Sequence, residues 1–276
     1  MFWPSPSSSW KAGTKIPWSR LLFYYYGTKK ALVKHYPSPI GFRIIEPFGG
    51  AAAYSVHHLM RDVRFSAVVY EKDPRVVALW TRLLGMSPEE IRAIPCPGVG
   101  DKTSDYFVMV AATGNAINKS RRMTVTPRMP RIVEIMKRQV ADKVLRLSGR
   151  IEVINADYRE AFPTAKTDTV FIDPPYSPNN RPAEGSLHGG GKGYAKGCCS
   201  GDLDYQEIAE FARNAEGGVI ACDYHDATWL PFGRLKRVTD SQKKSYAEGV
   251  WLKNIGGLSG PIFDLFGPSS TGPLEL

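Results

Sequence analysis

Residues 169–176 have the sequence TVFIDPPY, in which a short apolar run leads directly into an acid and two prolines. An apolar run of this length, bounded by turn residues, is typical of a buried strand. Proline lacks a backbone N–H and fixes φ, so the chain cannot continue in a sheet beyond Asp173. The stretch therefore predicts a buried strand whose carboxyl end presents the Asp173 side chain.

Three other stretches combine a buried strand with a glycine loop or an acid at its end. They are residues 42–46, which run into the loop PFGGAAA at 47–53, residues 65–70, which end before Glu71, and residues 151–154, which end near Asp157. Helices are predicted at 54–61, 74–84, 131–147 and 205–214, and further strands at 218–222 and 250–253. Asp73 and Pro74 provide an N-cap and a first residue for the second helix.

Strands that alternate with helices predict an α/β fold with a doubly wound, mostly parallel sheet. In such sheets, ligands bind beyond the carboxyl ends of the strands, where the strand order reverses. The glycine loop and the acids named above would all lie at that edge. The pattern therefore predicts a ligand site there before any family is considered.

The rest of the chain divides into four parts. Residues 1–20 are rich in Ser, Pro and Trp and are predicted to form a flexible N-terminal arm, and residues 256–276 a flexible C-terminal tail. Residues 21–84 and 131–255 carry the strand and helix pattern of the main domain. Residues 85–130 break that pattern with prolines, glycines and basic residues, and are predicted to form a small inserted lobe.

Composition narrows the class of partner. Lys and Arg number 36 against 27 Asp and Glu, which gives a formal net charge of +9. Such a surface attracts nucleic acid, although a charge of this size also serves solubility alone. No run of about 18 apolar residues and no signal-peptide pattern occurs, so we expect no membrane contact and a cytoplasmic protein. The four cysteines and five histidines lack a disulfide or metal spacing, so we expect reduced thiols and no metal.

The DPPY stretch suits the chemistry of an amino group. A carboxylate accepts hydrogen bonds only, and Pro174 leaves its carbonyl free as a second acceptor. Two acceptors match the two N–H donors of a planar amino group, and Tyr176 offers an aromatic face for stacking a base. A plain turn after the strand, with Asp173 as a local cap, is the alternative.

In its motifs the sequence resembles the Dam-like DNA adenine-N6 methyltransferases, which use S-adenosylmethionine. The resemblance covers about residues 21–254 and depends on five motifs in the family's order. These are YYGTK at 25–29, EPFGGA at 46–51, the acid Glu71, NADY at 155–158 and DPPY at 173–176. Ala52 stands where many members carry glycine, and Glu71 replaces the commoner Asp.

The resemblance implies a seven-stranded-type methyltransferase sheet and a set of site residues. Catalysis would involve Asp173, Pro174, Pro175 and Tyr176. The cofactor would be held by Tyr25, Lys29, Glu46, Pro47, Phe48, Gly49, Gly50, Glu71, Asp157, Tyr158 and Asp173. The target adenine would be flipped out of double-stranded DNA and methylated by direct displacement, in a bacterial or phage protein, with or without a partner restriction enzyme.

The inserted lobe is where this family reads its target, so its basic residues are the candidate DNA contacts. They are Lys119, Arg121, Arg122, Arg128 and Arg131, with Asn115 and Asn118 able to read base edges. A solvated basic loop is the alternative. We expect Lys137 and Arg138 to be surface charges and the glycine-rich stretch 185–201 to be mobile. Residues Ile262–Phe266 faintly resemble peptides that dock on bacterial sliding clamps, although packing on the chain's own domain is the simpler interpretation.

Two other functions remain open from the sequence. DPPY also occurs in methyltransferases that act on guanine-N2 in ribosomal RNA, but these lack the N-terminal Y-x-G-x-K element and have a shorter stretch before DPPY. A catalytically silent nucleic-acid-binding protein of the same fold is the third possibility. The intact DPPY and glycine loop favour the DNA enzyme.

Overall fold

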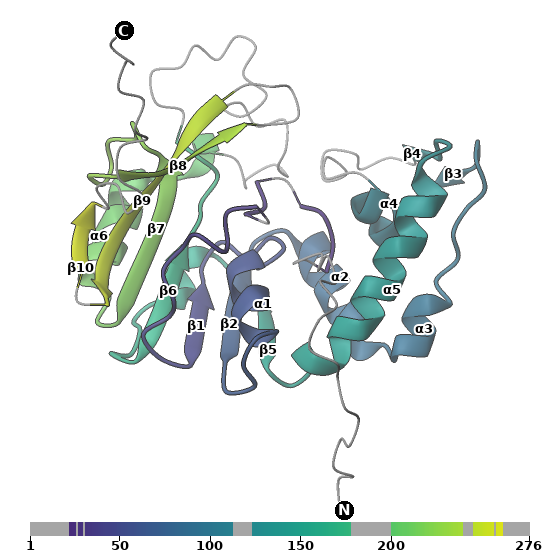
Figure 1. The fold of residues 1–276 in the computed structure, drawn as a ribbon, viewed down its shortest axis with the longest axis horizontal. Coiled ribbons are helices and arrows are strands. Elements are labelled where there is room, and N and C mark those ends of the chain that lie inside the picture. Colours follow the sequence, from purple (N-terminus) through teal and green to yellow (C-terminus); the bar gives the residue numbers. More distant parts are fainter. Residues whose placement is uncertain are drawn as a thin grey trace, which may run out of the picture.

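The computed structural model describes residues 22–25, 27–29, 31–112, 123–177, 200–239, 245–256 and 258–261. Its centre is an eight-stranded sheet with five parallel strands in the order β7-β6-β1-β2-β5 (Figure 1). These strands are β1 (Arg43–Glu46), β2 (Ser66–Glu71), β5 (Ile151–Asn155), β6 (Asp168–Ile172) and β7 (Gly218–Tyr224). The predicted α/β class and mostly parallel sheet are confirmed.

Three antiparallel strands complete the sheet beyond β7. They are β8 (Gly233–Thr239), β9 (Ser245–Ile255) and β10 (Leu258–Pro261). β9 pairs with β7 along one edge, and its other edge is shared between β8 and β10. The sequence pattern predicted only a short part of β9 and missed β8. Residues 258–261, which we expected in a flexible tail, form a strand because they pair with β9.

The strand order reverses between β1 and β6. From β1 the chain moves outward through β2 to β5, and it then returns to the other side of β1 as β6. All five strands are parallel, so their carboxyl ends lie along one edge of the sheet. The point of reversal therefore lies beside the ends of β1 and β6, where Glu46 and Asp173 are found.

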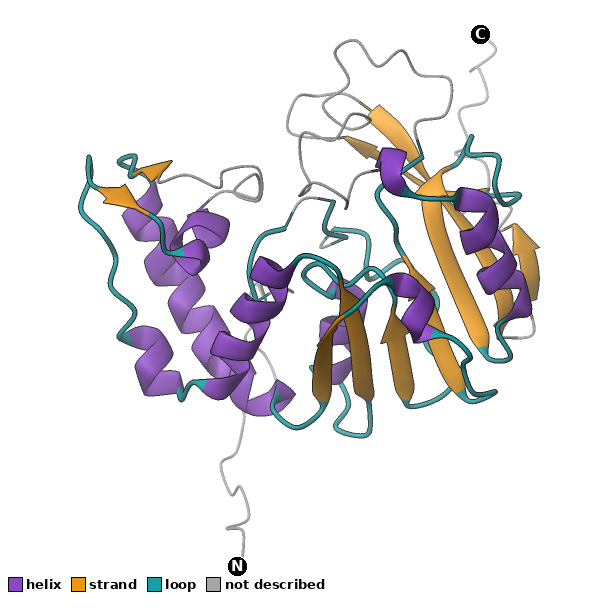
Figure 2. Cartoon of the chain, turned by 180° about the vertical axis from the view of Figure 1, so that it is seen from behind, coloured by secondary structure: helices purple, strands orange, loops and turns teal. Residues whose placement is uncertain are grey.

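The two faces of β6 pack against different helices. Phe171 stacks on Tyr54 of α1 (Ala53–Leu59), with ring centroids 4.4 Å apart. Val170 and Ile172 point to the opposite face and belong to the apolar cluster of α6 (Tyr205–Asn214). Figures 1 and 2 show α1 and α6 on opposite faces of the sheet. Burial on both faces explains why Val170, Phe171 and Ile172 are apolar in succession.

Helix α2 (Pro74–Gly85) begins as the sequence predicted. The side chain of its N-cap, Asp73, accepts a hydrogen bond from the Arg75 backbone N–H, and Pro74 occupies the first turn. Such a cap stabilises a helix by about 1 kcal/mol, because it satisfies one of the free N–H groups of the first turn. Asp73 lies two residues after Glu71, the last residue of β2, so the cap also fixes the turn beside Glu71.

The stretch after α2 forms a helical lobe beside the sheet (Figure 2). It contains α3 (Pro88–Arg92), α4 (Tyr106–Ala112) and the two-residue strands β3 (Lys102–Thr103) and β4 (Met123–Thr124). The long helix α5 (Met129–Leu147) packs against both α3 and α4 and then leads into β5. The lobe therefore shares α5 with the main domain.

Lys137 of α5 corrects the prediction of a surface charge. Its side chain is buried, and its Nζ donates to the Ile94 carbonyl at 2.8 Å and pairs with Glu134. The helical spacing could not reveal this, because the burial comes from packing on α3. Arg138 is exposed, as expected.

No helix among the described residues is long and apolar enough to cross a membrane. Several predictions fall outside the described residues: the N-terminal arm at 1–20, most of the glycine-rich stretch at 185–201, the clamp-like Ile262–Phe266, and Cys198 and Cys199. Cys96 and Cys222 are free thiols.

Candidate functional site

Lys29 and Asp173 form an ion pair at the point of strand reversal. Lys29 Nζ lies 2.8 Å from Asp173 Oδ1, and it also donates to the Gly27 carbonyl. Burial raises the pKa of Asp173, and the Lys29 charge opposes that shift. Burial alone would lower the pKa of Lys29, but Asp173 and Glu248 together raise it above its ordinary value. The two motifs YYGTK and DPPY, predicted separately, therefore meet in one buried charged contact.

Glu248 of β9 completes this cluster, and the sequence analysis missed it. Its Oε1 accepts hydrogen bonds from the hydroxyls of Tyr36 at 2.6 Å and Tyr176 at 2.5 Å. The same oxygen lies 4.0 Å from Lys29 Nζ. Burial raises the pKa of Glu248 to about 7. The one local signal was an acid set beside the apolar run Val250–Leu252.

The Tyr176 ring lies against the Lys29 ammonium group. Lys29 Nζ is 4.2 Å from the ring centroid, a cation–π contact, and Tyr224 meets the same ring edge-on. Burial raises the pKa of the Tyr176 hydroxyl well above its ordinary value. The ring is thus held from several sides, and the hydroxyl acts as a donor.

The two prolines differ in what their carbonyls contact. The Pro175 carbonyl accepts a hydrogen bond from the Tyr205 hydroxyl of α6. Among the described residues, the Pro174 carbonyl has no hydrogen-bond donor. Just beyond them, buried Asp223 accepts from the Ser177 backbone N–H and from Trp229 Nε1. These contacts fix the DPPY turn while leaving one carbonyl available.

The glycines of the loop after β1 are required by contacts within the protein. A Cβ on Gly49 would lie 2.4 Å from Val69 Cγ1, and one on Gly50 would lie 2.9 Å from Tyr25 Cδ1. Gly50 also has φ +50°. Tyr25 therefore covers the loop. Ala52 adopts φ 44° as the N-cap of α1, which explains why glycine suits that position better.

Glu46 and Glu71 brace this loop from the ends of β1 and β2. Glu46 Oε1 accepts from the Ser55 backbone N–H at 2.6 Å, and burial raises its pKa to about 8. Glu71 accepts from the Gly50 and Asp73 backbone N–H groups, at 2.7 Å each, and burial raises its pKa to about 7. Both carboxylates thus bond to the backbone, and each oxygen keeps a second lone pair.

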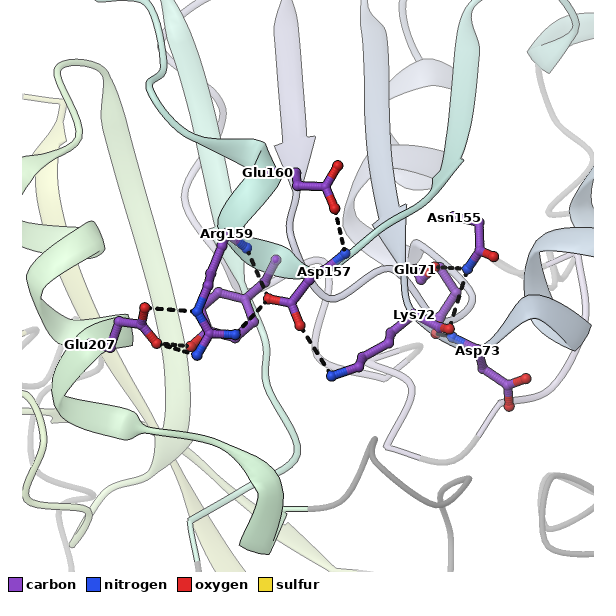
Figure 3. Close-up of polar contacts among 9 residues, drawn as sticks. Glu71, Lys72, Asp73, Asn155, Asp157, Arg159, Glu160 and Glu207 are labelled. Carbon is purple, nitrogen blue, oxygen red and sulfur yellow. Dashed lines mark hydrogen bonds and ion pairs between the residues drawn. The ribbon is translucent and has the colours of Figure 1, made fainter.

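A chain of charged side chains runs along the same edge from β2 to α6 (Figure 3). Asp157 caps the 3-10 turn Tyr158–Ala161, pairs with Lys72 at 3.1 Å, and accepts from Arg159. Arg159 also contacts both carboxylate oxygens of Glu207. Lys72 and Arg159 are about half exposed, so these pairs position the turn more than they stabilise the fold.

Tyr158 links this chain to the loop after β1. Its hydroxyl donates to Glu207 at 2.6 Å, and its ring stacks on Phe48 with centroids 5.0 Å apart. Asn155, at the end of β5, donates to the Glu71 carbonyl at 2.9 Å. The residues predicted to hold a cofactor, from the loop after β1 to NADY, therefore lie along one edge of the sheet, together with Pro47.

The candidate DNA contacts are only partly described. Arg128 and Arg131 lie at the start of α5 and are exposed, with no acid in the first turn of that helix. Lys119, Arg121 and Arg122, together with Asn115 and Asn118, fall outside the described residues. Within the described part of the chain, no group of three His, Cys, Asp or Glu side chains could hold a metal ion.

Comparison with known proteins assigns no family. No model of a known protein family matches the chain, and no curated protein matches it either. The relationship to the Dam-like methyltransferases therefore remains a prediction from the five motifs.

Proposed function

We propose that this protein is an S-adenosylmethionine-dependent methyltransferase that modifies the N6 amino group of adenine in DNA. The observation that carries the proposal is the contact between Lys29 and Asp173 at the point of strand reversal. Ligands of doubly wound sheets bind at this point. A mostly buried carboxylate held there by a lysine from a second motif is an arrangement suited to binding an amino group.

The residues at the edge of the sheet fit a nucleoside-like cofactor. Glu71 has lone pairs free for ribose hydroxyls, although both of its oxygens already accept backbone N–H groups. The stacked rings of Phe48 and Tyr158 provide an aromatic surface beside them. When bound, S-adenosylmethionine would supply an electrophilic methyl group on a sulfonium.

Asp173 and Pro174 would orient the amino group of the target base. Asp173 Oδ1 is buried against Lys29, but the side chain as a whole keeps 18% exposure, which leaves Oδ2 for a substrate. Oδ2 and the free Pro174 carbonyl would each accept one N–H of the amino group. This would direct the nitrogen lone pair toward the methyl group without a covalent enzyme intermediate.

Tyr176 would receive the face of the extruded base. Extrusion from the duplex costs a few kcal/mol, and stacking on an aromatic ring returns about 1–3 kcal/mol of it. The Tyr176 ring is already fixed by Glu248, Lys29 and Tyr224, so its side chain would lose little conformational entropy when the base binds. Positioning of this kind supplies much of the rate in a displacement between two bound groups.

Double-stranded DNA is the polymer we favour as substrate. The net charge of +9 favours a nucleic acid, and Arg128 and Arg131 present cations where the α5 dipole is already positive. Such a placement opposes helix stability and is better explained by an anionic partner. The helical lobe that carries Arg128 is the part of the chain that would contact DNA beside the flipped base.

The test is methyl transfer from labelled S-adenosylmethionine to unmethylated bacterial DNA and, in a parallel reaction, to ribosomal RNA, each followed by nucleoside analysis. We expect label in N6-methyladenine. Label in guanine of ribosomal RNA would replace this proposal with the RNA enzyme. Cofactor binding without transfer to either polymer would favour a silent nucleic-acid-binding protein.

A further inference from the structure

Glu248 is a fully buried acid near the DPPY turn, and its two oxygens have different surroundings. The side chain has no exposed surface. Oε1 accepts from the hydroxyls of Tyr36 and Tyr176, whereas Oε2 is buried and has no hydrogen-bond partner among the residues that the structure describes. A substrate cannot reach either oxygen, so any role of Glu248 must act through its neighbours.

Those neighbours are the groups that flank Asp173. Tyr176 is the fourth residue of DPPY and is anchored by its hydroxyl to Glu248. Lys29 lies 4.0 Å from Glu248, 2.8 Å from Asp173 and 4.2 Å from the centre of the Tyr176 ring. Glu248 thus fixes the ring by a hydrogen bond and shares the lysine with Asp173.

We propose that Glu248 is a positioning residue that holds the Tyr176 ring and the Lys29 ammonium group in register with Asp173. This inference rests on the proposed function, because it assigns the two groups to base stacking and to the orientation of the catalytic acid. Glu248 lies on β9, which pairs antiparallel to β7, and Glu248 is opposite Tyr224 in that register. The antiparallel part of the sheet beyond β7 thereby contributes to the site.

Stability alone does not explain a carboxylate at this place. Burying a charge is costly, and a carboxylate oxygen without a hydrogen bond adds to the cost. Replacing a whole buried charged cluster by apolar side chains is often neutral or stabilising, so stability alone does not require the cluster of Glu248, Lys29 and Asp173. A carboxylate that anchors two phenols and a lysine has a use in the site that leucine would lack.

Two substitutions separate the charge from the hydrogen bonds. Glu248→Gln keeps an acceptor for the tyrosines but removes the charge facing Lys29, and Glu248→Leu removes both. We expect kcat to fall in the order wild type, Glu248→Gln, Glu248→Leu, with the last lower than wild type by about tenfold or more, because small misplacements cost large factors in rate. KM for S-adenosylmethionine should stay within about threefold, since Glu248 lies beside Lys29 but has no described contact with the loop after β1, Glu71 or Asp157.

The matched control is Asp168→Asn. Asp168 is also a buried carboxylate, but it lies at the opposite end of β6 and pairs with Arg43. It should change thermal stability without changing kcat. If Asp168→Asn lowers kcat as much as Glu248→Leu, or if Glu248→Leu leaves kcat unchanged, Glu248 has no positioning role.

A double-mutant cycle with Tyr176→Phe tests whether Glu248 acts through the tyrosine hydroxyl. The fold-decrease in kcat of the double variant, Glu248→Leu with Tyr176→Phe, should be smaller than the product of the fold-decreases of the two single variants. If the two fold-decreases in kcat simply multiply, Glu248 does not act through the Tyr176 hydroxyl. Tyr36→Phe, which removes a hydroxyl from the same oxygen, provides a milder variant if Glu248→Leu does not fold.

A spectroscopic measurement separates failure of this inference from failure of the proposed function. In protein carrying 13C-labelled tyrosine, the Cζ signals of Tyr36 and Tyr176 are assigned by their loss in the two Phe variants. Glu248→Leu should shift the assigned Cζ signals of both Tyr36 and Tyr176. Asp168→Asn should shift neither signal. If the shifts occur but wild type methylates no DNA, the proposed function fails while the contact stands. If no shift occurs, the inference is wrong whatever the enzyme does.

Discussion

Lys29 Nζ lies 2.8 Å from Asp173 Oδ1, and this contact joins a loop near the start of the chain to the end of the central strand β6. A second carboxylate, Glu248, lies 4.0 Å from the same ammonium group. One cation therefore faces two acids in a region largely removed from water. Because a buried charge is costly without a partner, each of the three groups depends on the other two.

Asp173→Ala should abolish methyl transfer while leaving the protein folded, because Lys29 keeps Glu248 and the Gly27 carbonyl as partners. The carboxylate is proposed to accept an N–H of the target base, and no neighbouring acid can replace it, since Glu248 has no exposed surface. Methyl incorporation into DNA should fall by about a hundredfold or more, comparable to the loss of a key transition-state hydrogen-bonding group. Far-ultraviolet circular dichroism and urea unfolding check that the fold is intact. Near-normal transfer by Asp173→Ala would remove Asp173 from the mechanism.

Lys29→Met should destabilise the protein, and more at pH 8 than at pH 5. The substitution keeps the length of the side chain but leaves Asp173 and Glu248 without a cation. Removing one partner of a buried pair costs about 3–5 kcal/mol. At low pH the two acids can take up protons, because burial already raises the pKa of both, and part of the loss is recovered. Urea unfolding at the two pH values measures the difference, and an equal loss at both would contradict this account.

Glu46 makes stability depend on pH in the opposite sense to an ordinary salt-bridged acid. Its pKa is raised by burial from 4.5 to about 8, so the folded protein binds a proton that the unfolded chain releases. The stabilisation is complete below pH 4.5 and is lost as the pH rises toward 8. The slope reaches at most about 1.4 kcal/mol per pH unit for each such group. Glu71 and Glu248, both with a pKa raised to about 7, act in the same direction.

Glu46→Gln should flatten this dependence. The amide keeps an acceptor for the Ser55 backbone N–H but carries no titrating proton. The variant should match wild type near pH 5 and be more stable than wild type near pH 8, as measured by urea unfolding across that range. Glu152→Gln, at an exposed position of β5, is the matched control and should leave the slope unchanged. A slope in Glu46→Gln equal to that of wild type would show that Glu46 does not titrate between these values.

Gly50→Ala should destabilise the fold. Gly50 has φ +50°, and an added Cβ would lie 2.9 Å from Tyr25 Cδ1. The left-handed conformation alone costs a non-glycine residue about 1–2 kcal/mol, and displacement of the Tyr25 ring adds to it. Gly85→Ala is the control, because Gly85 ends α2 with open space around it and alanine is the better helix former. The melting temperature should fall in Gly50→Ala and should stay level or rise in Gly85→Ala.

The local parts of the site could be predicted from the sequence because each follows from a short pattern. A strand that ends in Asp173, an acid after β2 and a glycine loop after β1 are all readable from neighbouring residues. Parallel strands bring their ends to one edge, so the nearness of the glycine loop, Glu71 and Asp173 followed from the fold. The contact between Lys29 and Asp173 did not, because Lys29 lies on a loop before β1. The close contacts of Gly49 with Val69 and of Gly50 with Tyr25 follow from no short pattern.

Glu248 could not be predicted in the same way. Its place beside Tyr176 depends on the antiparallel register of β9 against β7, which follows from no short pattern. Lys137 is a second case, because its burial depends on how α3 packs on α5. In both, a charged side chain reaches a partner on a distant element. The periodicity of a helix or strand gives no information about which distant element a side chain will contact.

Substitution of Arg128 and Arg131 tests the DNA surface proposed for the lobe. Both are exposed at the start of α5, where positive charge opposes the helix dipole, so Arg128→Ala with Arg131→Ala should leave stability unchanged or slightly higher. If the two side chains contact phosphates, DNA affinity should fall and the slope of log affinity against log salt should decrease by about 2. Arg64→Ala is the control, because Arg64 is also exposed but pairs with Asp62 beside β2. Fluorescence anisotropy over a series of salt concentrations measures both quantities. An unchanged salt slope in the double variant, or an equal change in Arg64→Ala, would mean that DNA is not bound at this end of α5.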